Sequence, residues 1–295
     1  MLLQSPAREV LREMGIVNRN PMMDEHRAWL KWHDEWGFSM DAVREAELEE
    51  NTVIVFTTDH GIAFPHMKCT LYDTGIGVAL MIKYPGNPTR GMVTDALVSQ
   101  VDVFPTLCDL CGIDKPEWLT GTSLTDILAG KEGARGREEI FAEVTYHASY
   151  EPMRCVRTER YKLIRRFDDH NGVVPSNIDN GPSKQFVLDA GILDRVHARE
   201  MLFDLYLDPM ERENLVLDAR YHEVYDDLSM RLYRWMERTD DPLLRTGPRV
   251  PAPRGAAINK LTCLHAEYED FESAETLRCG AQDEETDALK LGLFH

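Results

Sequence analysis

Two kinds of hydrophobic pattern follow one another in the first third of the chain. In residues 24–50, tryptophans and other large apolar residues recur at spacings of three and four, with charged residues between them. This period predicts an amphipathic helix that packs on a sheet. Residues 53–58 and 78–83 are instead almost continuously apolar or β-branched, which is typical of strands covered on both faces.

Strand and helix patterns alternate in the first part of the chain, and the middle turns to antiparallel strand pairs. Helices are expected over residues 102–112, 123–129 and 219–238, and strands over residues 140–144, 153–157, 161–164 and 201–205. A three-residue connection between two of these strands, 158–160, suits a hairpin. Residues 168–185 are rich in Asn, Gly, Pro, Ser and Asp and predict a long surface loop, and the chain beyond Pro242 is expected to be irregular. The order of the elements predicts an α/β core followed by a smaller α+β unit.

Charge and composition exclude several classes of protein. The 295 residues hold 33 Lys and Arg against 51 Asp and Glu, a net charge of −18, which argues against nucleic acid and anionic membranes as partners. No apolar run approaches the ~20 residues of a membrane helix, and the first residues turn polar too early for a signal peptide. The six cysteines do not form a disulfide scaffold in a chain of this length. The compartment stays open.

Candidate chemistry follows the first buried strand directly. Asp59, His60 and Gly61 come at its end, and His66 and Lys68 follow in the next loop. In open α/β sheets, ligands bind just beyond the carboxyl ends of strands. A carboxylate there can hold a hard divalent cation, and a lysine can neutralise a sulfate or phosphate. The alternative is that Asp59 ends a loop and His60 lies on the surface.

Five ordered motifs resemble the sulfatases of the alkaline phosphatase superfamily. Residues 51–61 resemble the second metal-ligand motif of that family, and the resemblance continues through Lys68. The other motifs are residues 71–78 (family L-Y-E-x-G-x-x-V), 100–107 (D-x-x-P-T-L), 161–164 and 203–215 (L-Y-D-L-x-x-D-P-x-E-x-x-N-L). Residues 61–65 and 152–154 are similar to the heparan N-sulfatase-like branch. The resemblance covers roughly residues 38–255.

The resemblance implies a fold and a set of site residues. The expected fold is a sulfatase-like mixed sheet flanked by helices, with its later part in residues 1–135 and an α+β C-terminal subdomain in residues 136–255. Residues 256–295 are expected to be an acidic tail, solvated or disordered. By position, Asp59 and His60 would be Ca²⁺ (or Mg²⁺) ligands and Lys68 would bind sulfate oxygens. His147 is a candidate for the substrate pocket, with a surface or structural histidine as the alternative, and His66 is interpreted as a loop residue first.

One motif of the family is missing from this sequence. Sulfatases use a formylglycine made from the Cys or Ser of C/S-x-P-x-R. Three P-x-R triplets occur here, and the residue two positions before each proline is Gln4, Gly86 or Tyr150, none of which can form the aldehyde. No catalytic nucleophile is therefore identified, and two metal ligands alone predict a weak site, since Ca²⁺ takes six to eight oxygens. We expect only the later part of a sulfatase in this chain, with an exposed apolar edge that favours association.

The resemblance thus implies a metal-assisted sulfuric ester hydrolase that acts on a sulfate ester or sulfamate, with a sulfated sugar or other small sulfated molecule as substrate. A phosphodiesterase or phosphonate hydrolase of the same superfamily is an alternative. So is a non-catalytic fragment or pseudoenzyme. The expected protein partners are a second copy of the chain or a separate N-terminal half.

Overall fold

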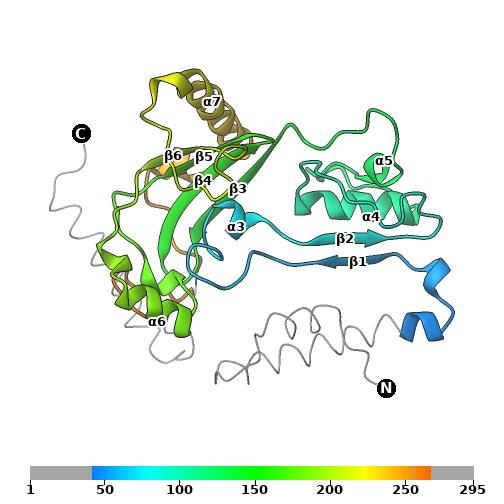
Figure 1. Cartoon of the computed structure of the whole chain (residues 1–295), viewed down its shortest axis with the longest axis horizontal. Helices are drawn as coiled ribbons and strands as arrows, with labels where there is room; N and C mark the ends of the chain where they lie inside the picture. Colours follow the sequence, from blue (N-terminus) through cyan, green and yellow to red (C-terminus); the bar gives the residue numbers. More distant parts are fainter. Residues whose placement is uncertain (1–41, 255, 267–295) are drawn as a thin grey trace. The chain divides into compact units, whose positions relative to one another are not determined.

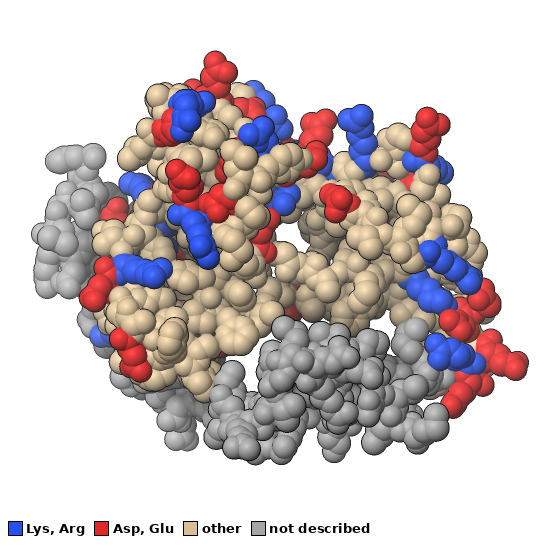
Figure 2. Space-filling model, viewed as in Figure 1, with Lys and Arg blue, Asp and Glu red and all other residues tan. Residues whose placement is uncertain are grey.

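The computed structural model describes residues 42–254 and 256–266 (Figure 1). Among these, residues 42–55 and 82–90 belong to one compact unit, and residues 56–81, 91–254 and 256–266 belong to a second. None of the helices in the described ranges has the length and apolar composition that crossing a bilayer requires. On the face seen in Figure 2, Lys and Arg side chains lie interspersed with Asp and Glu.

The smaller unit contains a short 3-10 helix, η1 (Glu49–Asn51), the first two residues of one strand and the last two residues of another. These strands, β1 (Ile54–Thr57) and β2 (Leu80–Lys83), pair as a two-stranded sheet, so both predicted strands are confirmed. The prediction that they are covered on both faces is wrong, because their residues are only partly buried or exposed. The helix predicted over residues 24–50 lies outside the described residues up to residue 41. Its predicted end is wrong, because the helical backbone of residues 42–45 gives way to a turn in which Glu47 has φ 56°.

The larger unit is built on a four-stranded antiparallel sheet. Its strands are β3 (Glu139–Tyr146), β4 (Tyr150–Thr158), β5 (Tyr161–Arg166) and β6 (Glu200–Asp204), and they pair in that order. The predicted hairpin between β4 and β5 is confirmed, and the Thr158 hydroxyl closes it by donating to the Tyr161 carbonyl oxygen at 3.1 Å. Each strand therefore neighbours the next one along the chain, as sequential strands most often do.

Alternating residues of this sheet form two separate cores. Val156, Leu163 and Leu202 face α7 (His222–Arg238), which follows the 3-10 helix η5 (Ala219–Tyr221) and packs across the sheet through its buried apolar stripe (Figure 1). The opposite face, with Cys155 and Ile164, packs on Leu71 and the segment around it. This second core seats the segment that carries the candidate site residues, because Leu71 lies only three residues after Lys68.

A buried carboxylate organises the helical part of the same unit. Asp102 ends the 3-10 helix η2 (Gln100–Asp102) and is followed by α4 (Val103–Cys111) and α5 (Thr125–Leu128), which confirm two predicted helices. Its oxygens accept hydrogen bonds from the Ser99 and Thr122 N–H groups at 2.9 and 2.6 Å and from Arg137 Nε at 2.8 Å. Burial alone would raise the pKa of Asp102, but these donors outweigh it and lower the pKa.

Two predictions of irregular chain are wrong. Residues 168–185 contain the 3-10 helix η3 (Pro175–Asn177) and the start of α6 (Pro182–Asp189), which is followed by the 3-10 helix η4 (Ile192–Asp194); beyond residue 241 the chain forms α8 (Pro242–Thr246). Both α-helices begin with proline, which is suited to the first helical position because its missing N–H has no helical partner there. Ser176 and Asn177 are buried rather than on the surface. At the beginning of the predicted tail, Asn259 is also buried and pairs with Ser149.

Candidate functional site

The segment that follows β1 folds back onto a short helix, α3 (Asp73–Ile76). The Gly61 N–H donates to the Gly75 carbonyl oxygen at 2.9 Å, and the Thr74 hydroxyl donates to the His66 carbonyl oxygen at 2.9 Å. Within the loop, the Lys68 N–H donates to the Ile62 carbonyl oxygen at 3.1 Å. We call residues 59–68 the site loop. These hydrogen bonds fix its two ends on α3.

Glycine is required where the site loop and α3 touch. A Cβ atom at Gly61 would lie 1.8 Å from the Thr74 carbonyl oxygen, and one at Gly75 would lie 2.4 Å from the Met67 carbonyl oxygen. Gly61 immediately follows Asp59 and His60, and Met67 precedes Lys68. The backbone of α3 therefore lies against the immediate neighbours of the predicted metal and sulfate ligands.

One residue near the far end of the site loop and one directly after it have left-handed backbone conformations. His66 has φ 63° and Cys69 has φ 65°. Such conformations cost free energy for residues other than glycine and persist where the surrounding structure enforces them. Lys68 lies between these two positions, so its backbone is defined on both sides.

Asp59 and His60 lie next to each other but do not form a closed metal site. The Asp59 side chain is 85% exposed, and its Oδ2 lies 3.3 Å from His60 Nε2. His60 Nδ1 lies 2.7 Å from the Gly61 carbonyl oxygen and donates to it, since a carbonyl oxygen only accepts. No group of three or more His, Cys, Asp or Glu residues in the described ranges could hold a metal ion. Two donors do not fit Ca²⁺, which takes six to eight oxygens, so calcium binding stays a prediction.

Lys68 pairs with a carboxylate that the sequence did not single out. Its Nζ lies 2.9 and 3.1 Å from the two oxygens of Asp179, and both side chains are partly buried. The buried ammonium of Lys184 in α6 donates to the Ile178 carbonyl oxygen at 2.9 Å and to Asn180 Oδ1 at 3.0 Å. Lys184 thus binds the residues directly before and after Asp179, which fixes the backbone position of Asp179.

His147 lies in the turn between β3 and β4, and its electrostatics connect it to the site loop. Burial lowers its pKa, and the nearby charge of Lys68 lowers it further, while Asp179 opposes this effect and the nearby His60 imidazole adds to the lowering. The imidazole is therefore neutral at pH 7. His147 thus lies near enough to Lys68, His60 and Asp179 for these residues to affect its pKa, and His60 in turn lies beside Asp59.

A buried polar network holds the turn that carries His147. Asn177 Oδ1 accepts hydrogen bonds from two successive backbone N–H groups of the turn, at 3.0 and 2.8 Å. The hydroxyls of Ser149 and Ser176 lie 2.5 Å apart, and the Asn259 amide donates to the same turn at 3.1 Å. Because Asn177 lies only two residues before Asp179, one network positions both sides of the site.

A cavity of about 60 Å³ lies beneath the far end of the site loop. His66, Lys68, Glu151, Arg166 and His197 are among the residues that line it. Burial, assisted by the positive charge of Arg166, lowers the pKa of His197 to about 4, and burial raises the pKa of Glu151 although Arg166 opposes this. Most of the surface that lines the cavity is apolar, and these charged and polar side chains form the remainder of its wall.

Comparisons with known proteins identify the family to which the chain belongs. Residues 61–184 match the family model described as "N-sulphoglucosamine sulphohydrolase, C-terminal". The human N-sulphoglucosamine sulphohydrolase is 31% identical over 252 residues, which is 77% of this chain and 48% of that protein. An ulvan-active sulfatase of Formosa agariphila is 28% identical over 221 residues, or 70% of this chain and 42% of that protein.

Solved structures support the same conclusion. A 2-O GAG sulfatase superposes with a TM-score of 0.53 and 27% identity, over 69% of this chain and 40% of that one. The fold is the α/β architecture of alkaline-phosphatase-like hydrolases. The chain belongs to the sulfatase family and corresponds to its C-terminal portion. It spans about half the length of the curated relatives it matches, or less.

Proposed function

We propose that this chain forms the sulfate-binding part of a sulfatase site that hydrolyses a sulfate ester or sulfamate on a sulfated sugar. The observation that carries the proposal is the group of Lys68, Asp179, His60 and His147 around one loop. The names of the relatives support the substrate class, since N-sulphoglucosamine, ulvan and GAG are sulfated carbohydrates or their units.

In this proposal each side chain has a separate task. The Lys68 ammonium attracts the sulfate oxygens, and Asp179 keeps it directed toward the site when no anion is bound. His147 is neutral at pH 7, so it hydrogen-bonds to the substrate without adding charge. Asp59 and His60 contribute two donors to a metal shell that needs further ligands.

The nucleophile is assigned to none of the 295 residues, because the sequence holds no C/S-x-P-x-R motif. We therefore propose that a separate sulfatase segment supplies the formylglycine and the remaining metal ligands. The chain by itself is expected to bind sulfated sugars without turning them over.

Calorimetric titration of the full chain with N-sulfoglucosamine tests the sulfate-binding role. A lost charge-assisted hydrogen bond costs about 1.5–3 kcal/mol, so Lys68→Met should weaken binding by about 10- to 150-fold. Lys115→Met is the matched control. Lys115 Nζ also pairs with an aspartate, Asp109 of α4, at 2.9 Å, but this pair lies outside the site loop. Equal affinity of the Lys68→Met variant and the wild type would contradict the proposal.

A paired assay separates the sulfatase from the phosphonate hydrolase alternative. An aryl sulfate and the matching aryl phosphonate are incubated with the full chain, with and without Ca²⁺, and competition of each with N-sulfoglucosamine binding is measured. The proposal expects the sulfate to compete more strongly. Stronger competition by the phosphonate would favour the alternative, and metal-dependent hydrolysis abolished by Asp59→Ala would show that the chain has its own nucleophile.

A further inference from the structure

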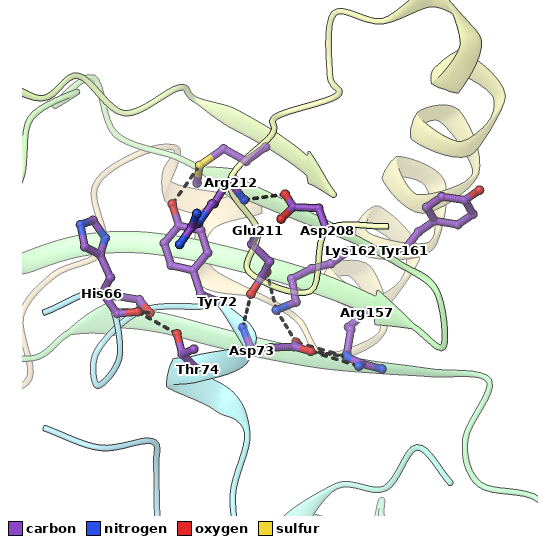
Figure 3. A network of polar contacts seen from close by, with 12 residues as sticks. His66, Tyr72, Asp73, Thr74, Arg157, Tyr161, Lys162, Asp208, Glu211 and Arg212 are labelled. Carbon is purple, nitrogen blue, oxygen red and sulfur yellow. Dashed lines mark hydrogen bonds and ion pairs between the residues drawn. The ribbon is translucent and has the colours of Figure 1, made fainter. Parts of the chain in front are cut away.

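Three sequence motifs outside the site meet in one partly buried cluster of charges. Lys162 Nζ of β5 lies 2.5 Å from Asp73 Oδ1 of α3 and 2.8 Å from Glu211 Oε1, which follows β6 (Figure 3). The Lys162 side chain is 0% exposed and that of Glu211 is 2% exposed. The motifs at residues 71–78, 161–164 and 203–215 thus each supply one member. Among the described residues, the ion pairs that join these three members do not involve Lys68, Asp179, His60 or His147.

A second cation balances the cluster. Arg157 of β4 contacts the Asp73 carboxylate through Nε at 3.2 Å and Nη2 at 3.0 Å. Burial alone would raise the pKa of Asp73, but the hydrogen bonds from Arg157 and the charge of Lys162 outweigh it and lower the pKa. Burial raises the pKa of Glu211, although Lys162 opposes this. Two carboxylates are therefore held between two cations, with Lys162 and Glu211 buried and Asp73 and Arg157 partly exposed.

The backbone around Glu211 places its carboxylate against Lys162 and the Asp73 N–H. Glu211 has φ 53°, a left-handed conformation that costs free energy for a glutamate. Asp208 stabilises the turn by accepting hydrogen bonds from the N–H groups of Arg212 and Glu213 at 2.5 and 2.8 Å. In Figure 3 the Glu211 side chain points between Asp73 and Lys162. Its Oε2 also accepts the Asp73 N–H, at 2.5 Å.

The cluster and the site loop share one element, α3. On one side, Asp73 binds Lys162 and Glu211 through its side chain and backbone. On the other side, Thr74 and Gly75 bind the two ends of the site loop. A movement of α3 would shift the backbone that carries Asp59, His60 and Lys68, because the glycine contacts leave no space between the two segments.

We propose that Lys162 and Glu211 are positioning residues of the sulfate-binding site. They fix α3 on the sheet and thereby hold the site loop in its ligand-binding conformation. Only one arrangement of α3 satisfies all the charges of a buried ion cluster, whereas an apolar contact would tolerate sliding. The meaning of this role for ligand binding rests on the function proposed above, but the ordering of the loop can be measured independently of any ligand.

Hydrogen–deuterium exchange of the full chain tests this role directly. The variants are Lys162→Met, which removes the central cation, and Glu211→Gln, which keeps the shape and an acceptor for the Asp73 N–H. Asp241→Asn is the matched control, because Asp241 also forms a buried ion pair, with Arg154 at 2.6 Å, but joins β4 to the start of α8. Exchange is followed in peptides that cover residues 59–70 and, as a reference, in α7.

The expected result is specific to the site loop. Both cluster variants should speed exchange in residues 59–70 by about tenfold or more, as expected for a locally destabilised segment, while α7 stays protected. Asp241→Asn should leave residues 59–70 unchanged. Binding of N-sulfoglucosamine should weaken in the same two variants and not in the control.

Two results would overturn the proposal. One is unchanged exchange of residues 59–70 in Glu211→Gln, the milder variant, in a sample with native circular dichroism. The other is equally faster exchange of that loop in Asp241→Asn, which would show only a general loss of stability. If only the proposed sulfate-binding function is wrong, the result looks different. The site loop would still exchange faster in Lys162→Met than in the wild type, but neither the wild type nor any variant would bind the sugar.

Discussion

Replacement of Gly61 by alanine should separate the site loop from α3. The new Cβ would lie 1.8 Å from the Thr74 carbonyl oxygen, while non-bonded carbon contacts are most favourable at about 3.5–4.0 Å. The two backbone segments must therefore move apart by more than about 1 Å, which breaks the 2.9 Å hydrogen bond from the Gly61 N–H to the Gly75 carbonyl oxygen. Overpacking costs about 1–3 kcal/mol and a lost hydrogen bond about 0.5–1.5 kcal/mol. The free energy of unfolding should fall by about 2–4 kcal/mol.

Urea denaturation measures this loss, and the affinity for N-sulfoglucosamine measures its effect on the site. Gly181→Ala is the matched control, because a Cβ at Gly181 would meet no atom within 4 Å. The control should stay within about 0.5 kcal/mol of the wild type, as surface substitutions generally do. Wild-type stability and affinity in Gly61→Ala would refute the claim that the close contact with α3 positions the site loop.

Two further predictions concern pH. The pKa of Asp102 is lowered in the folded chain, so its stabilising effect is complete above the unfolded value of 3.8 and is lost as the pH falls below that value. The Asp102→Asn variant should therefore have a lower free energy of unfolding at pH 7, and that free energy should decline less in acid than in the wild type. Urea denaturation across pH measures both effects. Burial lowers the pKa of His197 from 6.5 to about 4, so the unfolded chain binds the extra proton first and stability should fall as the pH drops from 6.5 to 4. A His197→Gln variant should lose that decline, and an NMR titration that gives His197 a pKa near 6.5 would contradict the prediction.

Sequence patterns predicted the elements that are stabilised by apolar side chains buried at regular intervals along the chain. The apolar stripe of residues 219–238 appears as α7, which packs on the sheet through Leu228, Leu232 and Met236. Gly112 marks the end of α4 because it adopts φ 66°, which favours glycine. In these places the local signal and the tertiary environment agree, so a single sequence is sufficient.

The polar segment around η3 could not be predicted in the same way. Ser176 and Asn177 have the composition of a surface loop, yet both are buried because Ser149 and its neighbours satisfy their hydrogen bonds. Those partners lie more than 25 residues away in the sequence. Only the folded chain brings them together.

The candidate site was predicted in part for the same reason. Lys68 was identified from its motif, but its partner Asp179 is 111 positions away in a segment without any periodic pattern. A lone aspartate in such a segment gives no signal until the fold places it. The same holds for the cluster around Lys162, whose three motifs were visible in the sequence while their convergence was not.

A ¹H–¹⁵N NMR titration of the full chain with N-sulfoglucosamine shows directly whether a sulfated sugar binds at the site loop. We expect saturable shifts for the backbone N–H groups of the non-proline residues in 61–68 and for those of His147 and Asp179, all reduced in Lys68→Met. Shifts confined to other parts of the chain, such as α4, or no saturable shifts from the folded protein, would contradict this expectation.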